Sequence, residues 1–495
     1  MKTVLGIDVG TQSSKVVFYD FEQRKIVASG SAPHRLITGE DGTSEQEASW
    51  WVEAVEKALA EVPEEVRRSA VAAGVSGQQH GFVPVSTEGE VLHPVKLWND
   101  TSTAAECREL TDALGGEPEL IKTVGNPILP GYTASKILWL KKNHPEKFRS
   151  LGWVMLPHDY INYVLTGEVS MEFGDASGTG LLDIRNRCWS KRAADAVDPG
   201  LLAKLPPLRS PEEGAGRVTK EAAARFGLPA GIPVSTGGGD NMMAALGTGA
   251  VVPGRLTMSL GTSGTLFGYS DTPVSDPEGI IAGFCSSSGG WLPLLCTMNC
   301  TTATEELRGL FDMDLAAMEA AAAEAPAGCG GVTVLPYFSG ERTPNLPGAR
   351  ASILGLNREN SSRAHILRAA MEAAVYGMMI GLEAMNRLGV TPTELILTGG
   401  GSKNRLWQQM TADITGLPVK LLASHDSAAL GAAVQALWFY RKELPGAGQT
   451  LEDLVEDHVV KPGGQTITPG TDRDGYREGY RRYQEYLGRL ESLYR

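Results

Sequence analysis

The sequence has few cysteines, and they do not form the patterns that bind zinc or hold small secreted domains together. Six cysteines are spread over 495 residues, at positions 107, 188, 285, 296, 300 and 329, without a CxxC pair. Zinc sites and disulfide frameworks need closely spaced cysteines, so this spacing argues against both classes. We therefore expect reduced thiols in a cytoplasmic protein.

Long hydrophobic runs and an excess of basic charge are also missing. No apolar stretch approaches the roughly 20 residues that a membrane-spanning helix needs. The opening residues, MKTVLGIDVG, contain one lysine, and their apolar run is interrupted at Asp8, which is unlike a signal peptide. The formal net charge of −13 argues against a nucleic-acid-binding surface. We expect neither a membrane nor a nucleic acid as a partner.

Four glycine-rich turns follow apolar segments. They read DVGTQSSK (8–15), TGGGDN (236–241), SLGTSGT (259–265) and TGGGSKN (398–404). None matches the GxxxxGK[ST] or GxGxxG pattern of two common nucleotide-binding classes. Backbone N–H groups exposed in such turns form anion sites without net positive charge. The set is therefore typical of an acidic protein that binds nucleotide phosphates in another way.

The chain alternates segments of strand and helix character. Strands are expected at 3–9, 15–20 and 25–32, a helix from about Ser49, and a buried strand at 70–77. This alternation predicts an α/β fold with functional loops at the ends of strands.

The second half repeats the opening of the first half. Residues 255–270 again read strand, Gly-Thr turn, strand, so the turn at Gly10 aligns with the turn at Gly261. The acidic residue is not repeated, because Ser259 stands where Asp8 stands. The match suggests two related halves.

We expect the domain boundaries near residues 245 and 440. The N-terminal domain is expected at 1–245, the C-terminal domain at 246–440, and an extension at 441–495. A helix with tyrosines at mixed spacing, 476–494, ends the extension, and we expect it at the surface with a solvated face.

Two of the glycine turns carry a carboxylate, Asp8 and Asp240. Phosphoryl transfer needs Mg²⁺ with oxygen ligands and a group that accepts the proton of the attacking hydroxyl. One aspartate for each role is a sufficient set. The alternative for Asp240 is that it only caps the helix that follows, which is a common use of aspartate.

A further set of polar and aromatic residues suits a polyol. Amides and carboxylates bind hydroxyl groups, and an indole packs on the apolar face of a sugar. The candidates are Gln78, Gln79, His80, Trp98, Asn99 and Asp100. The alternative is that His80 and Trp98 are ordinary structural residues.

Two long motifs resemble the signatures of the FGGY carbohydrate kinases, which are relatives of actin, hexokinase and the heat-shock ATPases. GYTASKILWLKKN (131–143) fits the first signature, and ASILGLNRENSSRAHILRAAME (351–372) fits the second. The resemblance extends to about residue 440. It implies two ribonuclease-H-like domains that flank a cleft, with ATP and Mg²⁺ bound.

The resemblance also implies roles for individual residues. Asp240 is the expected catalytic base, and Asp8 and Asp240 are the expected Mg²⁺ ligands. The expected nucleotide-binding residues are Thr11, Gln12, Ser13, Gly261, Thr262, Gly400, Gly401 and Asn404. The expected sugar-binding residues are Gln79, His80, Trp98, Asn99, Asp100, Asp240 and Asn241.

Within the family, SGQQHG and LWNDTST look most like the versions in kinases that act on D-xylulose. The expected reaction is transfer of the γ-phosphate of ATP to the 5-hydroxyl of D-xylulose. Two positions depart from that pattern: Gln79 stands where Met is common, and NDTST replaces NDTRT. Ribulose, gluconate or a glycerol-like polyol remain alternatives. Homodimers are common in the family, so a dimer is expected.

Other functional classes also remain open. A nucleotide-dependent conformational switch of the same superfamily would need no sugar site. A catalytically inactive sugar sensor would have lost Asp8 or Asp240, and both are present.

Overall fold

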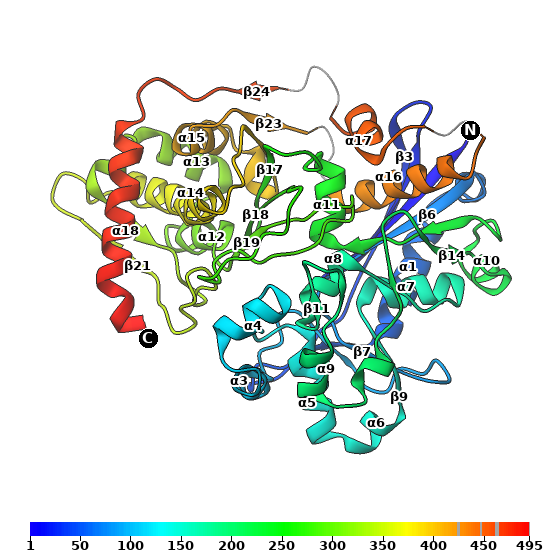
Figure 1. The fold of residues 1–495 in the computed structure, drawn as a ribbon. Helices are drawn as coiled ribbons and strands as arrows, with labels where there is room; N and C mark the ends of the chain where they lie inside the picture. The colour runs from blue at the N-terminus through cyan, green and yellow to red at the C-terminus, as the bar shows by residue number, and fades with distance from the viewer. Residues whose placement is uncertain (423–425, 446–447, 461–464, 495) are drawn as a thin grey trace. The chain divides into compact units, whose positions relative to one another are not determined.

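The computed structural model describes residues 1–422, 426–445, 448–460 and 465–494. The chain divides into two compact units (Figure 1). Unit 1 contains Met1–Val251, Ser270–Pro293 and Asp426–Lys461, and unit 2 contains Val252–Tyr269, Leu294–His425 and Pro462–Arg495. Both units are mixed α/β structures, as the alternation of strands and helices predicts.

The main sheet of unit 1 has the strand order β14-β15-β6-β1-β2-β3, and β16 also pairs with β6. Its strands are β1 (Thr3–Val9), β2 (Ser13–Asp20), β3 (Lys25–Pro33), β6 (Ala70–Gly77), β14 (Gly214–Arg217), β15 (Pro233–Ser235) and β16 (Gly238–Gly239). Strand β1 is antiparallel to β2 and parallel to β6, and β6 is parallel to β15 and β16. The carboxyl ends of β1, β6 and β16 therefore lie at the same edge of the sheet.

Short strands and helices complete unit 1. The short strands are β4 (Ile37–Thr38), β5 (Ser44–Gln46), β7 (Val83–Ser86), β8 (Val95–Lys96), β9 (Leu151–Met155), β10 (Met171–Glu172), β11 (Leu182–Asp183), β12 (Cys188–Trp189) and β13 (Leu208–Arg209). The helices are α1 (Ala48–Ala60), α2 (Glu64–Arg67), α3 (Ala104–Ala113), α4 (Glu117–Val124), α5 (Thr133–Asn143), α6 (Pro145–Ser150), α7 (Pro157–Thr166), α8 (Phe173–Ala176), η1 (Ser177–Thr179), α9 (Lys191–Val197), η2 (Leu201–Lys204), α10 (Lys220–Phe226), α11 (Asp240–Thr248), α16 (Ser427–Lys442) and α17 (Leu451–His458).

Helices cover both faces of the main sheet in unit 1. Side chains alternate between faces along a strand. Leu5 and Ile7 of β1 are fully buried in a core that includes Trp51 and Leu59 of α1. Gly6 faces the other way, toward α16, which lies against β1 and β6 in Figure 1.

Glycines allow α16 to pack unusually close to its neighbours. A Cβ at Gly6 would lie 1.9 Å from the Ala429 carbonyl oxygen, and one at Gly431 would lie 1.8 Å from the Met243 carbonyl oxygen of α11. No side chain larger than hydrogen fits at such distances. The contact fixes α11, the helix that begins at Asp240, against the sheet through α16.

The main sheet of unit 2 has the order β24-β23-β22-β17-β18-β19. Its strands are β17 (Arg255–Leu260), β18 (Gly264–Gly268), β19 (Leu294–Thr297), β22 (Glu394–Thr398), β23 (Val419–Leu421) and β24 (Thr466–Ile467), and β20 (Thr333–Leu335) pairs with β21 (Ser352–Leu354). Strand β17 is antiparallel to β18 and parallel to β22, as β1 is to β2 and β6. The shared order and directions confirm that the two halves repeat one topology.

The helices of unit 2 are α12 (Thr301–Leu310), α13 (Leu315–Glu324), η3 (Cys329–Gly331), α14 (Arg363–Arg387), η4 (Gly400–Lys403), α15 (Arg405–Thr415) and α18 (Asp474–Tyr494). The terminal helix α18 has an exposed face, as expected from its sequence, and packs on unit 2 with the other face. Tyr483 is buried, and its hydroxyl lies 3.0 Å from that of Tyr337. Tyr476 is buried and accepts a hydrogen bond from Arg368 of α14. The tyrosines therefore anchor the helix to unit 2.

The compact units do not follow the contiguous division at residues 245 and 440. Residues 270–293 and α16 belong to unit 1, although both come after its first long segment in the chain. The glycine contacts of α16 explain the placement of that helix. The domain boundaries themselves stay a prediction.

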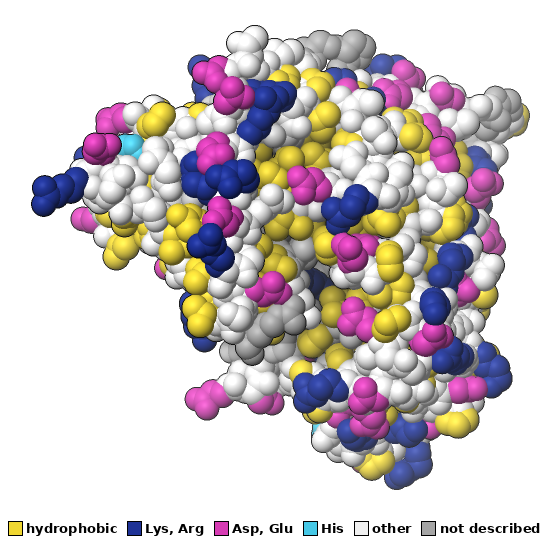
Figure 2. Space-filling view, turned by 60° about the vertical axis from the view of Figure 1, so that its left-hand side comes forward, with side chains coloured by type: hydrophobic (Ala, Val, Ile, Leu, Met, Phe, Trp, Pro, Cys, Tyr) yellow, Lys and Arg dark blue, Asp and Glu magenta, His cyan; other side chains and the backbone are white. Residues whose placement is uncertain are grey.

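Two observations concern the surface and membrane association. Among the described residues, no helix combines the length and apolar character required to span a bilayer. On the face shown in Figure 2, acidic and basic side chains are interspersed, and those described do not gather into a continuous basic area.

Candidate active site

The centre of the site in unit 1 is the carboxyl edge of its parallel strands. Asp8 of β1 and Gly238 of β16 both pair with Ser76, which lies on β6 between them. The Ser76 hydroxyl donates a hydrogen bond of 2.8 Å to Asp8 Oδ1. Ligands of α/β sheets bind at such edges. The turn that contains Asp240 follows β16 directly, so it reaches the same edge as Asp8.

Asp240 is the first residue of α11 and is not its N-cap. Gly239 occupies the cap position, so the capping alternative for Asp240 is wrong. Asp240 Oδ1 instead accepts hydrogen bonds from the backbone N–H of Asn241, at 2.8 Å, and from Asn241 Nδ2, at 3.0 Å. Gly237 has φ 70°, and a Cβ there would lie 2.2 Å from the Val75 carbonyl oxygen. The glycines therefore let the turn run close to β6.

The two carboxyl groups influence each other. Burial raises the pKa of Asp240 to about 7, helped by the negative charge of Asp8 and opposed by the hydrogen bonds from Asn241. Burial also raises the pKa of Asp8, while the hydrogen bond from Ser76 lowers it. A carboxylate with a pKa near 7 suits a general base. Two neighbouring carboxylates with little compensating charge also provide the oxygen ligands that Mg²⁺ takes, so Asp8 and Asp240 fit the expected metal ion.

Gln79 and Asn241 lie beside Asp240. Asn241 Nδ2 donates a hydrogen bond of 2.8 Å to Gln79 Oε1. A Cβ at Gly239 would lie 2.8 Å from Gln79 Cγ, so the Gln79 side chain presses against the backbone of the glycine turn. Gln79 and Asn241 are therefore joined to Asp240 by hydrogen bonds, and their sugar-binding roles stay a prediction.

His80 is held in a backbone conformation that only a few residue types adopt readily. Its φ is 63°, in the left-handed region. Its carbonyl oxygen accepts a hydrogen bond of 2.7 Å from the fully buried Lys136 Nζ and one of 3.2 Å from Thr133 Oγ1. Its ring packs against that of Tyr132 in a tilted arrangement, with the centroids 4.7 Å apart. Residues of the 131–143 motif therefore fix the position of His80.

Trp98 is tied to the turn after β1. Its indole N–H donates a hydrogen bond of 2.9 Å to Thr11 Oγ1, and the Thr11 hydroxyl donates to Gln78 Oε1 at 3.1 Å. Gln12 is exposed and Ser13 is half-buried in the same turn. Trp98 and Gln78 thus hold the candidate phosphate-binding turn in shape.

Asn99 and Asp100, two expected sugar-binding residues, make hydrogen bonds within their own loop region. Asp100 is fully buried, and its carboxylate accepts hydrogen bonds from the backbone N–H groups of Ser44 and Ser102 and pairs with the buried Lys96 at 3.3 Å. Asn99 Oδ1 accepts a hydrogen bond from Ser44 Oγ. The Asp100 carboxylate therefore supports the loop, whereas Asn99 is exposed, and the sugar-binding roles of both residues stay a prediction.

Unit 2 brings its two glycine turns together. Strands β17 and β22 are parallel, and Ser259 pairs with Thr398. Gly399 has φ 82°, and a Cβ there would lie 2.5 Å from the Leu260 carbonyl and 2.9 Å from the Gly261 nitrogen. The turn with Gly261 and Thr262 therefore lies directly against the turn that contains Gly400 and Gly401.

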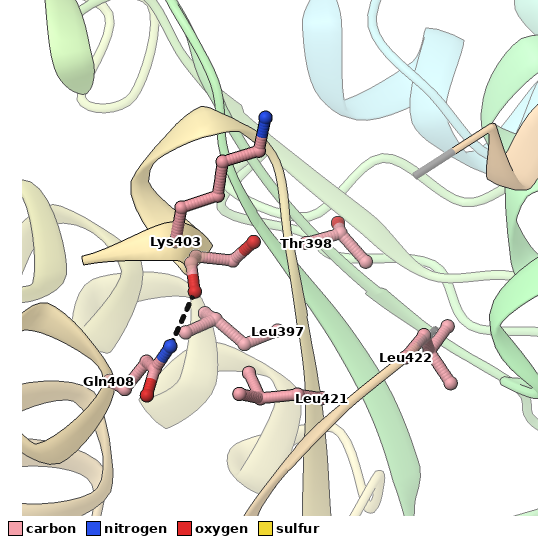
Figure 3. A pocket seen from close by; sticks show the side chains of 7 residues that line it. Leu397, Thr398, Lys403, Gln408, Leu421 and Leu422 are labelled. Atoms are coloured by element: carbon pink, nitrogen blue, oxygen red, sulfur yellow. Dashed lines mark hydrogen bonds between the residues drawn. The ribbon is translucent and has the colours of Figure 1, made fainter. Parts of the chain in front are cut away.

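A cavity of about 220 Å³ opens beside the second of these turns (Figure 3). It is lined by Leu397, Thr398, Ser402, Lys403, Gln408, Leu421 and Leu422. Gln408 Nε2 donates to the Ser402 carbonyl oxygen and holds the turn against α15. Asn404 caps α15, because its Oδ1 accepts a hydrogen bond from the Trp407 N–H. The lining combines three leucines with polar side chains, so the cavity suits a planar, partly polar ligand.

Comparison with known proteins identifies the family. The FGGY family of carbohydrate kinases, N-terminal domain, matches residues 3–247, and the C-terminal domain of that family matches residues 256–440. The chain belongs to the FGGY family of carbohydrate kinases. It is therefore a phosphotransferase that uses an alcohol group as acceptor, and the resemblance found in the sequence is confirmed.

Several relatives of this FGGY kinase match over nearly their whole length. Xylulose kinase from Haemophilus influenzae is 41% identical, with 98% of this chain and 99% of that protein covered. Xylulose kinase from Escherichia coli is 35% identical, with 87% and 88% covered. The crystal structure of a xyloylose kinase from Brucella ovis superimposes with a TM-score of 0.91 at 31% identity, covering 99% of this chain and 100% of that one. The predicted actin- and hexokinase-type fold with two domains is confirmed.

Several residues that shape the site of this FGGY kinase have no role that local sequence patterns indicate. Ser76 bonds Asp8, and His158 and Asp175 form a buried pair near Gln79. Ser76 could have been found from the pattern of its strand, because it is a polar residue near the end of an otherwise apolar run. His158 and Asp175 are 17 residues apart, and no local pattern connects them.

Proposed function

We propose that this FGGY kinase transfers the γ-phosphate of ATP to the 5-hydroxyl of D-xylulose and yields D-xylulose 5-phosphate and ADP. The observation that carries the proposal is the placement of Asp240 beside Asp8, Gln79 and Asn241 at the edge of the unit 1 sheet. The relatives named xylulose kinase support the choice of sugar. Ribulose, gluconate and glycerol-like polyols are the competing acceptors.

Asp240 acts as the general base in this proposal. A sugar hydroxyl is a poor nucleophile at neutral pH, and a carboxylate within hydrogen-bond reach orients it and accepts its proton as the bond to phosphorus forms. The raised pKa of Asp240, about 7, gives it affinity for that proton near neutral pH. Gln79, His80 and Asn241 bind the remaining hydroxyls and so determine which oxygen attacks.

Asp8, with Asp240, is the proposed holder of Mg²⁺. When bound, the ion neutralises charge on the phosphate oxygens and helps to orient them. Ser76 keeps the Asp8 carboxylate fixed through its hydrogen bond. Hard oxygen donors of this kind suit Mg²⁺ better than softer metal ions.

The glycine turns are the proposed nucleotide contacts. Backbone N–H groups of Thr11, Gln12 and Ser13 in unit 1, and of Gly261 and Thr262 in unit 2, serve the phosphates. Gly400, Gly401 and Asn404 serve the adenosine, next to the cavity in Figure 3. A cytoplasmic location and a homodimer stay part of the proposal.

A coupled ADP assay tests the proposal. Purified protein with Mg-ATP is given D-xylulose, D-ribulose, L-ribulose, gluconate and glycerol, and kcat/KM is measured for each. We expect D-xylulose to have the highest kcat/KM. A higher value for any other acceptor overturns the substrate assignment, and ADP release that no acceptor stimulates overturns the kinase proposal.

The position of transfer is checked on the product. ³¹P and ¹³C NMR of the product should show the phosphate on carbon 5. A phosphate on carbon 1 would contradict the proposed orientation of the sugar at Asp240.

A further inference from the structure

A buried glutamine, Gln46, lies against the turn that follows β1. It is the last residue of β5 and is fully buried. Its Nε2 donates hydrogen bonds to the carbonyl oxygens of Thr11, at 2.8 Å, and Arg35, at 2.9 Å. Its Oε1 accepts from Trp51 Nε1 at 2.8 Å and from Gln78 Nε2 at 3.0 Å. An amide has two N–H donors and two acceptor lone pairs, so its full hydrogen-bonding capacity is used.

The partners of the Gln46 amide allow only one orientation of it. The indole N–H of Trp51 can only donate a hydrogen bond, and a backbone carbonyl can only accept one. A reversed amide would place its NH₂ group against the Trp51 N–H and its oxygen against the Thr11 carbonyl. These buried groups would then lack partners, which costs free energy. Gln46 therefore presents donors, and not an acceptor, to the turn.

The hydrogen bond to the Thr11 carbonyl fixes one peptide unit of the turn. The carbonyl of Thr11 and the N–H of Gln12 belong to the same planar trans unit and point in opposite directions. Because the carbonyl points to Gln46, the Gln12 N–H points away from it. The next unit is held in the same way, since the Gln12 carbonyl accepts a hydrogen bond of 2.8 Å from the N–H of His34. The backbone donors of the turn are therefore set by carbonyls that the protein anchors.

The same amide also orders the side chain of Thr11. Gln78 donates to Gln46 with its Nε2, so its Oε1 is the end that accepts the Thr11 hydroxyl, at 3.1 Å. The Thr11 oxygen in turn accepts from Trp98 Nε1 at 2.9 Å. A closed ring of hydrogen bonds results, from Gln46 to the Thr11 carbonyl, from the Thr11 hydroxyl to Gln78, and back to Gln46. Connected hydrogen bonds of this kind strengthen one another by polarisation.

We propose that Gln46 is a positioning residue for the nucleotide phosphates: it fixes the Thr11–Gln12 peptide unit so that the Gln12 N–H is ready to donate to a phosphate oxygen. The inference rests on the proposed function, because Gln12 is a proposed nucleotide contact. Gln46 is fully buried, so it acts on the nucleotide only through the turn. A donor that is held before the ligand binds loses little freedom on binding, and this preorganisation increases affinity.

Gln46→Met tests the proposal by removing the amide at nearly constant volume. Without its donor, the Thr11 carbonyl can rotate and the Gln12 N–H is no longer held for a phosphate. A hydrogen bond to a charged group is among the stronger ones, so we expect KM for ATP to rise by about tenfold, with the sugar KM within about twofold of wild type. Calorimetry without sugar should show the same loss of affinity for Mg-ATP and none for adenosine, which has no phosphate.

Three results of this experiment would overturn the proposal. The first is an equal or larger rise in the sugar KM, because a general distortion of unit 1 would affect both ligands. The second is an equal loss of affinity for adenosine, because the phosphates would then not be involved. The third is a KM for ATP within about twofold of wild type, because the turn would then be ordered without Gln46.

Gln46→Glu is the second variant, and it keeps the test decisive if methionine prevents folding. Burial raises the pKa of a carboxyl group. Below that pKa the protonated carboxyl donates its O–H to the Thr11 carbonyl as the amide does, and above it two acceptor oxygens face that carbonyl. The ratio of KM for ATP in the variant to that in wild type should therefore be larger at pH 8.5 than at pH 6. Groups present in both proteins, such as His34, cancel in this ratio. A ratio within about twofold of one at both pH values overturns the proposal.

Asn126→Leu is the matched control for the loss of a buried amide in unit 1. Asn126 is 1% exposed, and its side chain makes two hydrogen bonds with Gly283: Nδ2 donates to the carbonyl at 2.6 Å, and Oδ1 accepts from the N–H at 2.7 Å. The substitution should lower the melting temperature and leave KM for ATP unchanged. A rise in KM for ATP equal to that of Gln46→Met contradicts the proposal.

The failure of this inference is distinguishable from that of the proposed function. Wild-type turnover on the panel of acceptors tests the function, and the variants are measured on whichever acceptor is used. A preferred acceptor other than D-xylulose overturns only the substrate assignment. Gln46 variants whose constants for ATP and sugar change together overturn only the positioning role. Wild-type protein that neither binds ATP nor turns over any acceptor overturns both.

Discussion

Ser76 donates a hydrogen bond of 2.8 Å to Asp8 across two neighbouring parallel strands. This bond is the structural support for a carboxylate that burial makes harder to ionise. It links the strand that carries the proposed metal ligand to the strand that leads into SGQQHG. We therefore expect a substitution at either residue to weaken the binding of Mg²⁺ more than the binding of the sugar.

Asp8→Asn is expected to lower kcat by about 100-fold or more and to raise the Mg²⁺ concentration needed for half-maximal activity, because an amide is a poorer ligand for a hard cation. Sugar binding, measured by calorimetry without nucleotide, should change little. An unaltered Mg²⁺ titration would contradict the metal role of Asp8.

Asp240→Asn should keep the hydrogen bond from the Asn241 N–H and lose the proton acceptor. We expect a loss of about 10²-fold or more in turnover number with saturating D-xylulose and Mg-ATP. The melting temperature should be unchanged or higher, because the repulsion from Asp8 is removed. Turnover near the wild-type value would exclude Asp240 as the base.

Glu172 should make the stability of the protein depend on pH. Burial raises its pKa from the ordinary value of 4.5 to about 7, so the folded state binds a proton that the unfolded state releases between these values. Its contribution to stability is therefore lost as pH rises from about 4.5 through 7. Glu172→Gln removes this dependence, so the melting temperature of wild type minus that of the variant should be larger at pH 5 than at pH 8.

The control for this measurement is Glu221→Gln, a change of an exposed residue on α10. Its difference from wild type should be the same at both pH values. An equal difference at both pH values for Glu172→Gln would refute the assignment of the raised pKa.

Gly431→Ala tests the close packing of α16 on α11. The added Cβ would lie 1.8 Å from the Met243 carbonyl oxygen, so the helices must separate. We expect a loss of about 3 kcal/mol or more in the free energy of unfolding and a clear fall in melting temperature. Gly488→Ala on α18 is the control, since a Cβ there meets nothing within 4 Å, and it should be neutral or stabilising.

Gly399→Ala tests the contact between the two turns of unit 2. The substitution combines φ 82° with a Cβ 2.5 Å from the Leu260 carbonyl. We expect KM for ATP to rise by about fivefold or more, since strain and displacement of this kind cost on the order of 1–3 kcal/mol, with sugar KM unchanged. Gly389→Ala has a similar φ and open space around it, so it controls for backbone strain alone.

The parts of the fold that depend on local pattern could be predicted from the sequence. The expected strand at 3–9 is observed as Thr3–Val9, and the helix expected from about Ser49 begins at Ala48. The turns around Asp8 and Asp240 could also be located, because each consists of glycines that directly follow an apolar run. A strand and the turn that ends it are both encoded by residues adjacent in the sequence.

Contacts between distant residues could not be predicted in this way. Asp100 is of a residue type that often binds sugars. Its carboxylate, however, pairs with Lys96 and accepts a hydrogen bond from the backbone N–H of Ser44, which is 56 residues away in the sequence. The sequence of α16 does not by itself indicate that this helix covers the sheet of unit 1. The close approach of α16 depends on the lack of a side chain at Gly6, which lies more than 400 residues earlier in the sequence. Only the folded structure brings Gly6 and α16 together.

The position of α16 in the chain affects how the nascent protein leaves the ribosome. The strands that it covers are made first, and Ser427 is made only after most of unit 2. At roughly 5–20 residues per second, synthesis from Val251 to Ser427 takes on the order of ten seconds or more. During that time the groove above Gly6 and Gly74 has no helix in it. A message truncated before codon 427 would therefore release a chain that has every strand of the main sheet of unit 1 but lacks the helix that covers one of its faces, and exposed apolar surface of this kind is a target for chaperones and proteases.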